Sequence, residues 1–552
     1  MDFKVCAKIV GMEGIRCEAV IRNNGSIEDI QVVACPKELK FTGKIVFTGN
    51  EIKLEFMGIK PGRGKVQLLI EGFTYTIPFV VFKEKEFFLA MVISSNYHIG
   101  FDPENYVFGF DEDNGNICGH AFRKACRTLG KDYHEHGLPV TWLIDPVVAA
   151  EGNEKIDNWH NTYYDDYGVM PSSWFNHNKN NYNTEFSLEE TVEMLASSVT
   201  GVEDKFNYYT NIVGIDQWVG SVGSHFVKAC EILNLKGIWG MGYDHFTCDT
   251  SMFHRGCPWD MYKPDRNDIK IPCTYPSDMW AFQWTTRDII NTVHTPTGAS
   301  GSVVFSTDAD DIRQTNILQK QKDYYTMLFR EFKSNMKYND FFVFLVHQED
   351  HDMHFEEDNI YLNDFLKDIK GESTPATLEE IVQWLNLKYP KEKNSTQVLS
   401  LKDILTCRNE VQWGYGGVQK PENWDNYKEG FPLHGAYFGS DAQVIVQKPL
   451  RKPIRVYDYG RRYDISETDS YPEEYFGEIE VLEEAYVMEA GVWKYSATIL
   501  VETGCERFPL VLWDYPQELR ERLAVLPMVH TDDFILCFLE LEAGENKITQ
   551  EF

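Results

Sequence analysis

FFVFLVHQEDH, residues 341–351, is the stretch that decides the fold. Its six leading apolar residues, 341–346, suffice for a strand buried on both faces, which is typical of parallel sheets. The stretch then runs without a break into four titratable side chains: His347, Glu349, Asp350 and His351. In an α/β barrel, side chains just past a strand's carboxyl end lie at the mouth where chemistry is done. The stretch therefore predicts a barrel strand that leads into a candidate site.

Strands of the same buried type alternate with helical segments from about residue 85 to residue 400. The expected strands are 87–94, 139–144, 211–216, 237–241, 280–284, 302–307 and 341–346. Ser187 with Glu190, and Thr377 with Glu380, have the spacing of capping boxes that begin helices. Strand–helix alternation on this scale predicts a parallel sheet, and about seven strands suit a closed or nearly closed (β/α) barrel. The fold class is therefore α/β, with a seven-stranded barrel in residues 85–400.

Two β-rich segments flank the predicted barrel. Residues 1–84 show period-2 apolar alternation broken by turn residues, which predicts a small antiparallel sandwich. This segment resembles bacterial immunoglobulin-like accessory domains, and we interpret it as a packing or spacer module. Residues 401–552 return to β patterns punctuated by prolines, which predicts a C-terminal all-β domain. Its sequence leaves open whether that domain buttresses the barrel or binds carbohydrate.

The composition excludes several classes of function. The 552 residues carry a formal net charge of −32, which repels nucleic-acid phosphates and anionic lipid head groups. No apolar run approaches the ~18 to 20 residues of a membrane span, and the first residues show no signal-peptide pattern. The 12 cysteines lack a Cys-x-x-Cys pair, so we expect reduced, mostly buried thiols. These features predict a cytoplasmic protein that does not bind nucleic acid or membranes; the oligomeric state is left open.

Acidic or imidazole side chains follow most of the predicted strands, and a barrel would gather them at one mouth. Residues 85–400 also hold 13 of the 15 histidines and 9 of the 13 tryptophans. Indole rings stack on sugar faces, so this enrichment suits a sugar-binding cleft, although large buried aromatics in a barrel core would produce the same count. The candidate substrate-binding residues are Trp218, His245 and Trp284, and the further strand-end candidates are His98, His177, Asp216, Asp308, Asp310, His347, Glu349 and His351.

The order of these segments resembles the glycoside hydrolase and polysaccharide deacetylase barrels. As in NodB-type deacetylases, a strand like 139–144 is followed by an Asn-His pair (176–177) and a capped helix, and a late strand ends in His347. The resemblance implies a divalent metal held by histidines, and His177 is the metal ligand that can be carried over. The first strand lacks the family's Asp-Asp pair, and Asn181 stands where its second metal-binding histidine belongs.

A second template in the same superfamily is similar to the family 57 and family 38 glycosidases. Their first strand ends in a histidine motif comparable to 96–98, and a carboxylate nucleophile follows a central strand, where this chain has Asp216. Retaining glycosidases need two carboxyl groups ~5 to 5.5 Å apart, for which Asp216 with Asp308 or Asp310 are the candidates. Amide or ester hydrolysis needs instead an activated water and a donor for the oxyanion.

If the last strand continues past its apolar run, residues 347, 349 and 351 point to one face and suit Zn, Mn or Fe. The alternative is that His347 bonds within the barrel while the other two belong to a solvated loop. The sequence thus predicts a carbohydrate-active hydrolase, with or without a divalent metal at His98, His177, His347 and His351, and no organic cofactor. Asp216, Asp308, Asp310 and Glu349 are its candidate catalytic acids. The competing hypothesis is a barrel without turnover that binds a glycan or a protein partner.

Overall fold

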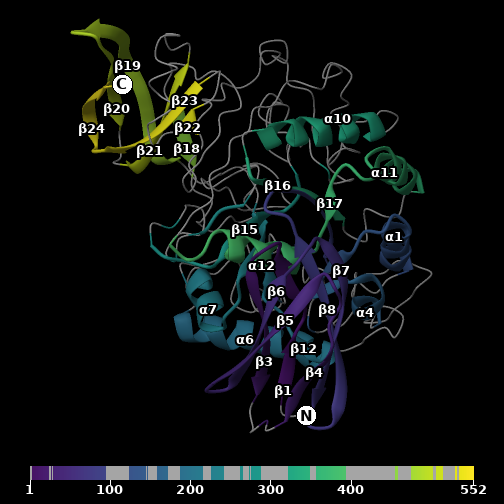
Figure 1. Cartoon of the computed structure of the whole chain (residues 1–552). Coiled ribbons are helices and arrows are strands. Elements are labelled where there is room, and N and C mark those ends of the chain that lie inside the picture. Colours follow the sequence, from purple (N-terminus) through teal and green to yellow (C-terminus); the bar gives the residue numbers. More distant parts are fainter. Residues whose placement is uncertain are drawn as a thin grey trace, which may run out of the picture.

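The structure is a computed structural model of the chain. It describes residues 3–23, 27, 29–94, 124–144, 146, 149, 158–171, 187–215, 225–241, 261–264, 266, 273, 275–286, 307, 321–337, 339–348, 356–392, 454–457, 474–501, 505–513, 529–530 and 534–551. These residues form a mixed α/β structure with strands at both ends of the chain and a parallel sheet between them (Figure 1). None of the described helices has the length and apolar character needed to cross a membrane.

The central sheet is a nearly closed barrel of seven parallel strands in the order β15-β14-β13-β11-β10-β9-β16. The strands are β9 Glu86–Ser94, β10 Val140–Ile144, β11 Asp166–Val169, β13 Ile212–Gly214, β14 Gly237–Met241, β15 Trp280–Gln283 and β16 Phe341–Gln348. β16 pairs with β9 along its whole length, from Phe341 opposite Glu86 to Gln348 opposite Ile93. The short β17, Thr374–Pro375, also pairs with β9.

Six of the predicted barrel strands are confirmed within one or two residues of their expected bounds. Of the predicted strand 302–307, the structure describes Thr307 alone, so that prediction lies outside the described residues. The seventh observed strand is β11, which the alternation pattern did not place among the seven because it is four residues long and begins with an aspartate. Both predicted capping boxes are present, at Ser187 with Glu190 and at Thr377 with Glu380.

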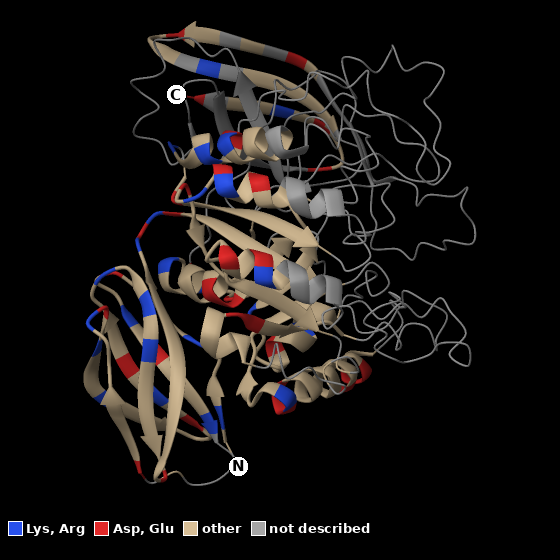
Figure 2. Cartoon of the chain, turned by 90° about the vertical axis from the view of Figure 1, so that its right-hand side faces the viewer, with Lys and Arg blue, Asp and Glu red and all other residues tan. Residues whose placement is uncertain are grey.

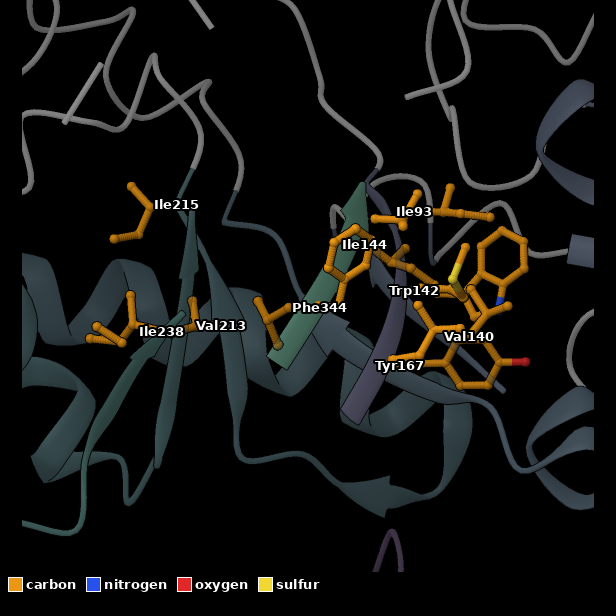
Figure 3. Packing of buried hydrophobic residues seen from close by; sticks show 14 of the residues in the cluster. Ile93, Val140, Trp142, Ile144, Tyr167, Val213, Ile215, Ile238 and Phe344 are labelled. Carbon is orange, nitrogen blue, oxygen red and sulfur yellow. The ribbon is translucent and has the colours of Figure 1, made fainter. Parts of the chain in front are cut away.

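Helices cover the outside of this sheet. They are α1 Lys124–Glu135, α4 Trp159–Tyr163, α6 Leu188–Phe206, α7 Phe226–Ile232, α10 Gln321–Ser334 and α11 Glu356–Asp368, with the 3-10 turn η3 Asn335–Lys337 after α10. Their buried apolar residues join the outward side chains of the strands, such as Trp142, Val213 and Phe344, in one core (Figure 3). Because every residue of β9 and β16 is buried, both faces of these strands must be covered.

The opposite face of the sheet packs around α12, Leu378–Lys388. Its residues Ile381, Val382 and Trp384 share a core with Phe88 and Val92 of β9. Alternate residues of β16, namely Phe341, Val343 and Leu345, belong to the same core. The inner face is therefore the face of odd-numbered residues on β16 and of even-numbered residues on β9.

The N-terminal residues form two sheets over a common core. One has the order β12-β1-β3-β6-β5, in which β12 is Tyr208–Tyr209 from a later part of the chain, and the other has the order β2-β8-β7-β4. The strands are β1 Phe3–Cys6, β2 Ile9–Met12, β3 Arg16–Asn23, β4 Ile30–Ala34, β5 Leu39–Thr48, β6 Glu51–Gly58, β7 Gly62–Ile70 and β8 Phe73–Phe82. This sandwich was predicted, and its immunoglobulin-like topology stays a prediction.

The sandwich is built into the barrel. β12, Tyr208–Tyr209, comes from the chain between α6 and β13, yet it pairs in parallel with β1. Val10 and Met12 of β2 lie in the same core as α12. Of the two roles expected for residues 1–84, a packing module or a spacer, packing is the one that these contacts support.

The described C-terminal residues are strands: β18 Ile454–Tyr457, β19 Glu474–Glu489, β20 Val492–Val501, β21 Cys505–Trp513, β22 Val529–His530, β23 Phe534–Leu541 and β24 Gly544–Glu551. They form a sheet of order β18-β19-β20-β24 and a second of order β21-β23-β22. Figure 2 shows that Lys, Arg, Asp and Glu positions are common along the strands of the N-terminal sandwich and on the helices, whereas the central sheet has few of them. A C-terminal domain that is β throughout stays a prediction.

Candidate active site

His347 lies at the carboxyl end of β16, on the inner face of the barrel. It shares this face with Val343 and Leu345, because side chains alternate along a strand. Its exposed fraction is 0%. The sequence prediction that this histidine ends a buried strand is confirmed, and its place is the end of the barrel where α/β barrels carry their chemistry.

Ser94, the last residue of β9, is the hydrogen-bond partner of His347. The distance from Ser94 Oγ to His347 Nε2 is 2.8 Å, and Ser94 is also fully buried. Val92 lies directly opposite His347 in the strand register, so Ser94 follows on the same inner face, two residues toward the mouth. A hydroxyl and an imidazole from neighbouring strands are thus joined at one end of the barrel.

Two indole rings enclose the imidazole. The centroid of the His347 ring lies 4.4 Å from that of Trp284 and 4.8 Å from that of Trp239. The two indoles are stacked with centroids 4.7 Å apart, and Trp239 Nε1 donates a hydrogen bond to the Trp284 carbonyl at 3.0 Å. These contacts fix the orientation of His347, since a ring packed on two sides has little freedom to rotate.

Three threonines, Thr285, Thr286 and Thr307, bind the backbone of β16 beside the histidine. Thr307 Oγ1 donates to the Leu345 carbonyl at 2.6 Å, and the Leu345 N–H donates to Thr286 Oγ1 at 2.8 Å. The His347 N–H donates to Thr285 Oγ1 at 3.3 Å. β15 and β16 are the two edge strands of the nearly closed barrel. The threonines lie between these edges, where a closed barrel would have paired strands. They therefore link the two edge strands and hold the strand that carries His347.

Most of the predicted site residues lie outside the described residues. They are the predicted metal ligands His98, His177 and His351, the predicted acids Asp216, Asp308, Asp310 and Glu349, and the predicted substrate-binding residues Trp218 and His245. His347 and Trp284 are the two described members of the set, and the structure brings them together. Trp284 is 2% exposed and packs on His347, whereas a sugar platform needs an open ring face. Its part in substrate binding stays a prediction.

The described residues do not by themselves form a divalent-metal site. In the described part of the chain, no three His, Cys, Asp or Glu side chains lie close enough to hold an ion. Among the described residues, the hydroxyl of Ser94 bonds His347 Nε2, and the indoles of Trp239 and Trp284 pack against the ring. This set does not fit Zn, Mn or Fe, which take imidazole together with thiolate, carboxylate or further imidazole ligands.

Ser94, Trp239 and the three threonines were not expected from the sequence. Ser94 stands in ISSNYH as the last residue of a strand that was predicted, so its position at the mouth could have been inferred from the barrel alone. Trp239 lies inside the predicted strand 237–241, and alternation along that strand would have placed it on one face. The threonines gave no comparable signal, because local sequence does not indicate that the edge strands β15 and β16 lie close to each other.

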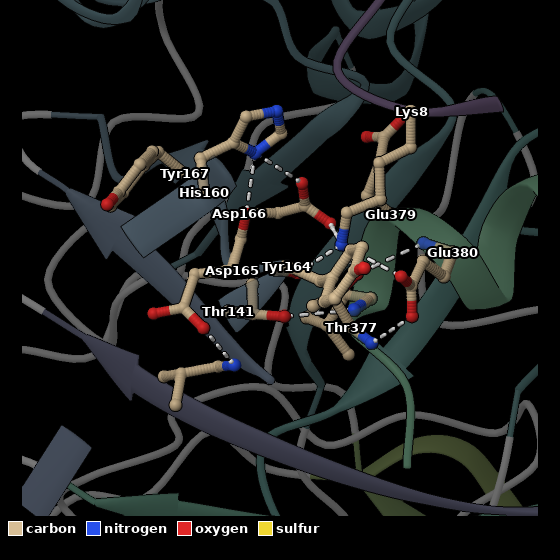
Figure 4. Close-up of polar contacts among 12 residues, drawn as sticks. Lys8, Thr141, His160, Tyr164, Asp165, Asp166, Tyr167, Thr377, Glu379 and Glu380 are labelled. Atoms are coloured by element: carbon tan, nitrogen blue, oxygen red, sulfur yellow. Dashed lines mark hydrogen bonds and ion pairs between the residues drawn. The ribbon is translucent and has the colours of Figure 1, made fainter. Parts of the chain in front are cut away.

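A second cluster of titratable residues is buried at the opposite end of the barrel (Figure 4). Lys8 Nζ of the N-terminal sandwich lies 2.8 Å from Asp166 Oδ2 at the start of β11 and 2.8 Å from Glu380 Oε1 of α12. Arg63 of β7 binds Glu380 with both terminal nitrogens, one of them 2.8 Å from Oε2. Glu379 accepts hydrogen bonds from the Asn211 backbone at 3.0 Å and from Gln383 Nε2 at 2.7 Å.

The neighbours of these carboxyl groups shift their pKa values in opposite directions. Burial alone would raise the pKa of Asp166, but the Lys8 charge and the hydrogen bond from His160 outweigh it and lower the pKa to about 2. For Glu380, the charges of Arg63 and Lys8 likewise outweigh burial and lower the pKa. Burial and the charge of Asp166 instead raise the pKa of Glu379 to about 7. Because the cluster lies at the amino ends of the strands, we assign it to stability.

The chain resembles known proteins only distantly in the comparisons made with sequences and solved structures. No known family profile matches the chain, and no curated protein matches it in sequence. Among solved structures, a fragment of the S-layer protein SbsC (domains 4 and 5) is 11% identical to this chain, with a TM-score of 0.13. The match covers 15% of this chain and 51% of that fragment, so this chain spans about half of its length. A Mycobacterium smegmatis protein assigned as a polysaccharide deacetylase is 10% identical over 54% of this chain and 90% of its own, with a TM-score of 0.34. A Bacteroides fragilis protein assigned as an alpha-galactosidase is 7% identical over 99% of this chain and 97% of its own, with a TM-score of 0.25. Likenesses at these scores carry no assignment of function.

Proposed function

We propose that the chain is a carbohydrate-active hydrolase whose reaction takes place at the barrel mouth around His347. The observation that carries this proposal is the hydrogen bond between His347 and Ser94, enclosed by Trp239 and Trp284 at the carboxyl end of the barrel strands. A proton-transfer group with a hydroxyl beside it at this end of the barrel suits a hydrolytic reaction. The order of strands and strand-end residues in the sequence supports carbohydrate as the substrate class.

His347 is the proton-transfer group in this proposal. An imidazole changes its charge near neutral pH, so it can accept a proton in one step of a hydrolysis and return it in the next. The packing of Trp239 and Trp284 holds its ring, and Thr285 holds its backbone N–H. Pre-set orientation of this kind lowers the entropic cost of reaching the transition state.

The predicted acids Asp216, Asp308, Asp310 and Glu349 remain candidates for a second catalytic group. Asp216 comes two residues after the end of β13, and Glu349 comes directly after β16. A metal at His98, His177 and His351 also remains a prediction for positions outside the described residues. No step of the proposed reaction is routed through a metal.

The test compares His347→Gln with the unmodified chain on a panel of acetylated and unmodified oligosaccharides. Release of reducing ends and of acetate is measured, and circular dichroism verifies the fold. Loss of a general acid–base lowers the rate by about 10²- to 10⁴-fold, so turnover by the variant is expected to be undetectable. His136→Gln is the matched control, because His136 directly follows the end of α1 outside the barrel and bonds Asn363 Oδ1 at 2.9 Å.

Equal turnover by His347→Gln and the unmodified chain would overturn the proposal. So would the absence of any release by the unmodified chain together with saturable oligosaccharide binding that His347→Gln weakens. That second outcome identifies a glycan-binding barrel without turnover.

A further inference from the structure

The pairing of Ser94 with His347 has the form of an activated nucleophile. A serine hydroxyl becomes nucleophilic when a base lies within hydrogen-bond reach and is itself held in place, at distances of about 2.6 to 3.2 Å. Ser94 Oγ lies 2.8 Å from Nε2 of His347, two indoles pack on the imidazole, and Thr285 Oγ1 accepts a hydrogen bond from the His347 backbone N–H. The serine and its base come from adjacent parallel strands, so β-sheet pairing itself fixes their separation.

The described surroundings of this pair carry no formal charge. Trp239, Trp284, Thr285 and Thr307 are neutral, and the hydroxyl of Ser94 is bonded to the imidazole. With a chain charge of −32, an anionic acid product would be repelled once it forms.

We propose that Ser94 is the nucleophile of an acyl-transfer reaction, and that the substrate is an O-acylated carbohydrate whose ester bond is hydrolysed. The proposal rests on the proposed function for its substrate class, and it selects the ester bond over the glycosidic bond. It requires no metal, because the base is the imidazole and the nucleophile belongs to the chain.

The reaction balances in two steps. Ser94 Oγ adds to the ester carbonyl carbon while its proton passes to Nε2; the bond to the sugar oxygen then breaks, and that oxygen takes the proton from Nε2. Water adds to the acyl-Ser94 carbonyl and gives a proton to Nε2; the bond to Oγ breaks, and Oγ recovers the proton. One ester and one water become one carboxylic acid and one sugar hydroxyl.

The test uses phenylmethanesulfonyl fluoride, a small reagent that sulfonylates activated serines with loss of fluoride, on the full chain. Intact mass is expected to show one adduct per chain, and peptide mapping is expected to place it on Ser94. The adduct is expected to be absent in Ser94→Ala, and to form at least about 10²-fold more slowly in His347→Gln, which lacks the base. Ser198→Ala is the control, since Ser198 is a buried serine on α6 that bonds the Met194 carbonyl at 3.3 Å.

An unlabelled Ser94 in the folded chain, or an adduct that persists in Ser94→Ala, would overturn the inference. A second measurement separates it from the proposed function. Acetate release from an acetylated sugar can be lost in His347→Gln but kept in Ser94→Ala. This result would support the proposed function and would rule out Ser94 as the nucleophile. A labelled Ser94 in a chain that releases no acetate from any carbohydrate supports Ser94 as the nucleophile and overturns the proposed function.

Discussion

Lys8 in the N-terminal sandwich and Asp166 in the barrel form an ion pair at 2.8 Å, with the Lys8 side chain fully buried and that of Asp166 4% exposed. Lys8 also binds Glu380 of α12, so one ammonium group joins three parts of the chain that lie far apart in sequence. Removing one member of a buried pair leaves its partner charged and desolvated, which costs more than the pair itself contributes.

Lys8→Met is therefore expected to lower the free energy of unfolding by about 3 to 5 kcal/mol. Urea denaturation followed by tryptophan fluorescence measures the change. Lys53→Met is the control, because the Lys53–Glu18 pair is partly exposed and such pairs contribute about 0 to 1 kcal/mol. A loss from Lys8→Met no larger than that from Lys53→Met would contradict a stabilising role for the buried cluster.

Deleting residues 1–84 is expected to prevent the barrel from folding. The deletion removes Lys8 and Arg63 from the carboxylates of Asp166 and Glu380, and it exposes the face of α12 that packs on β2. Each loss alone costs several kcal/mol, against a typical total stability of about 5 to 15 kcal/mol. Soluble expression and a cooperative thermal transition of the fragment 85–552 would show instead that the sandwich is dispensable.

Glu379 is expected to make the stability of the chain depend on pH between about 4.5 and 7. Its pKa in the folded chain is raised from 4.5 to about 7, so the folded state binds this proton more tightly than the unfolded state does. The stabilisation from this group is fully present below pH 4.5 and is lost as the pH rises through 7. At about 1.4 kcal/mol per pKa unit, the loss amounts to about 3 kcal/mol.

Glu379→Gln is expected to flatten this part of the curve of unfolding free energy against pH. Glu193→Gln, on an exposed position of α6, is expected to leave the curve unchanged. Asp166 acts in a separate window, because its lowered pKa of about 2 gives a stabilisation that is lost as the pH falls below 3.8. A curve for Glu379→Gln that keeps the slope of the unmodified chain between pH 4.5 and 7 would place the titrating group elsewhere.

Thr285→Val is expected to impair the site with a moderate loss of stability. The change removes the acceptor of the His347 N–H and the partner of Thr307 Oγ1 at 2.7 Å, and a buried group left without its partner costs about 1 to 3 kcal/mol. A small displacement of His347 should slow labelling of Ser94 by about tenfold or more. The labelling rate and the denaturation midpoint are the two measurements.

Thr326→Val provides the matched control for that experiment. Thr326 is a buried threonine on α10, and its hydroxyl has no hydrogen-bond partner among the described residues. Replacing this hydroxyl by a methyl group should leave labelling unchanged and should not destabilise the chain. Equal effects of the two variants would mean that the hydrogen bonds of Thr285 do not position His347.

The sequence determined the barrel elements and one member of the site. Continuous apolar runs such as 341–346 and 87–94 identify strands buried on both faces, and both capping boxes begin helices where expected. These features follow from local periodicity and end chemistry, which do not depend on distant residues. His347 was predictable for the same reason, because it directly follows such a run.

The tertiary structure decided the partners. Ser94 meets His347 across 253 positions of sequence, and Lys8 meets Glu380 across 372, so neither contact leaves a local pattern. Strand pairing brings the first two together, and packing of the sandwich on α12 brings the other two. Sequence alone specified which residues can carry the chemistry and the charge. The fold specified which of them are buried together, and burial is what makes their interactions strong.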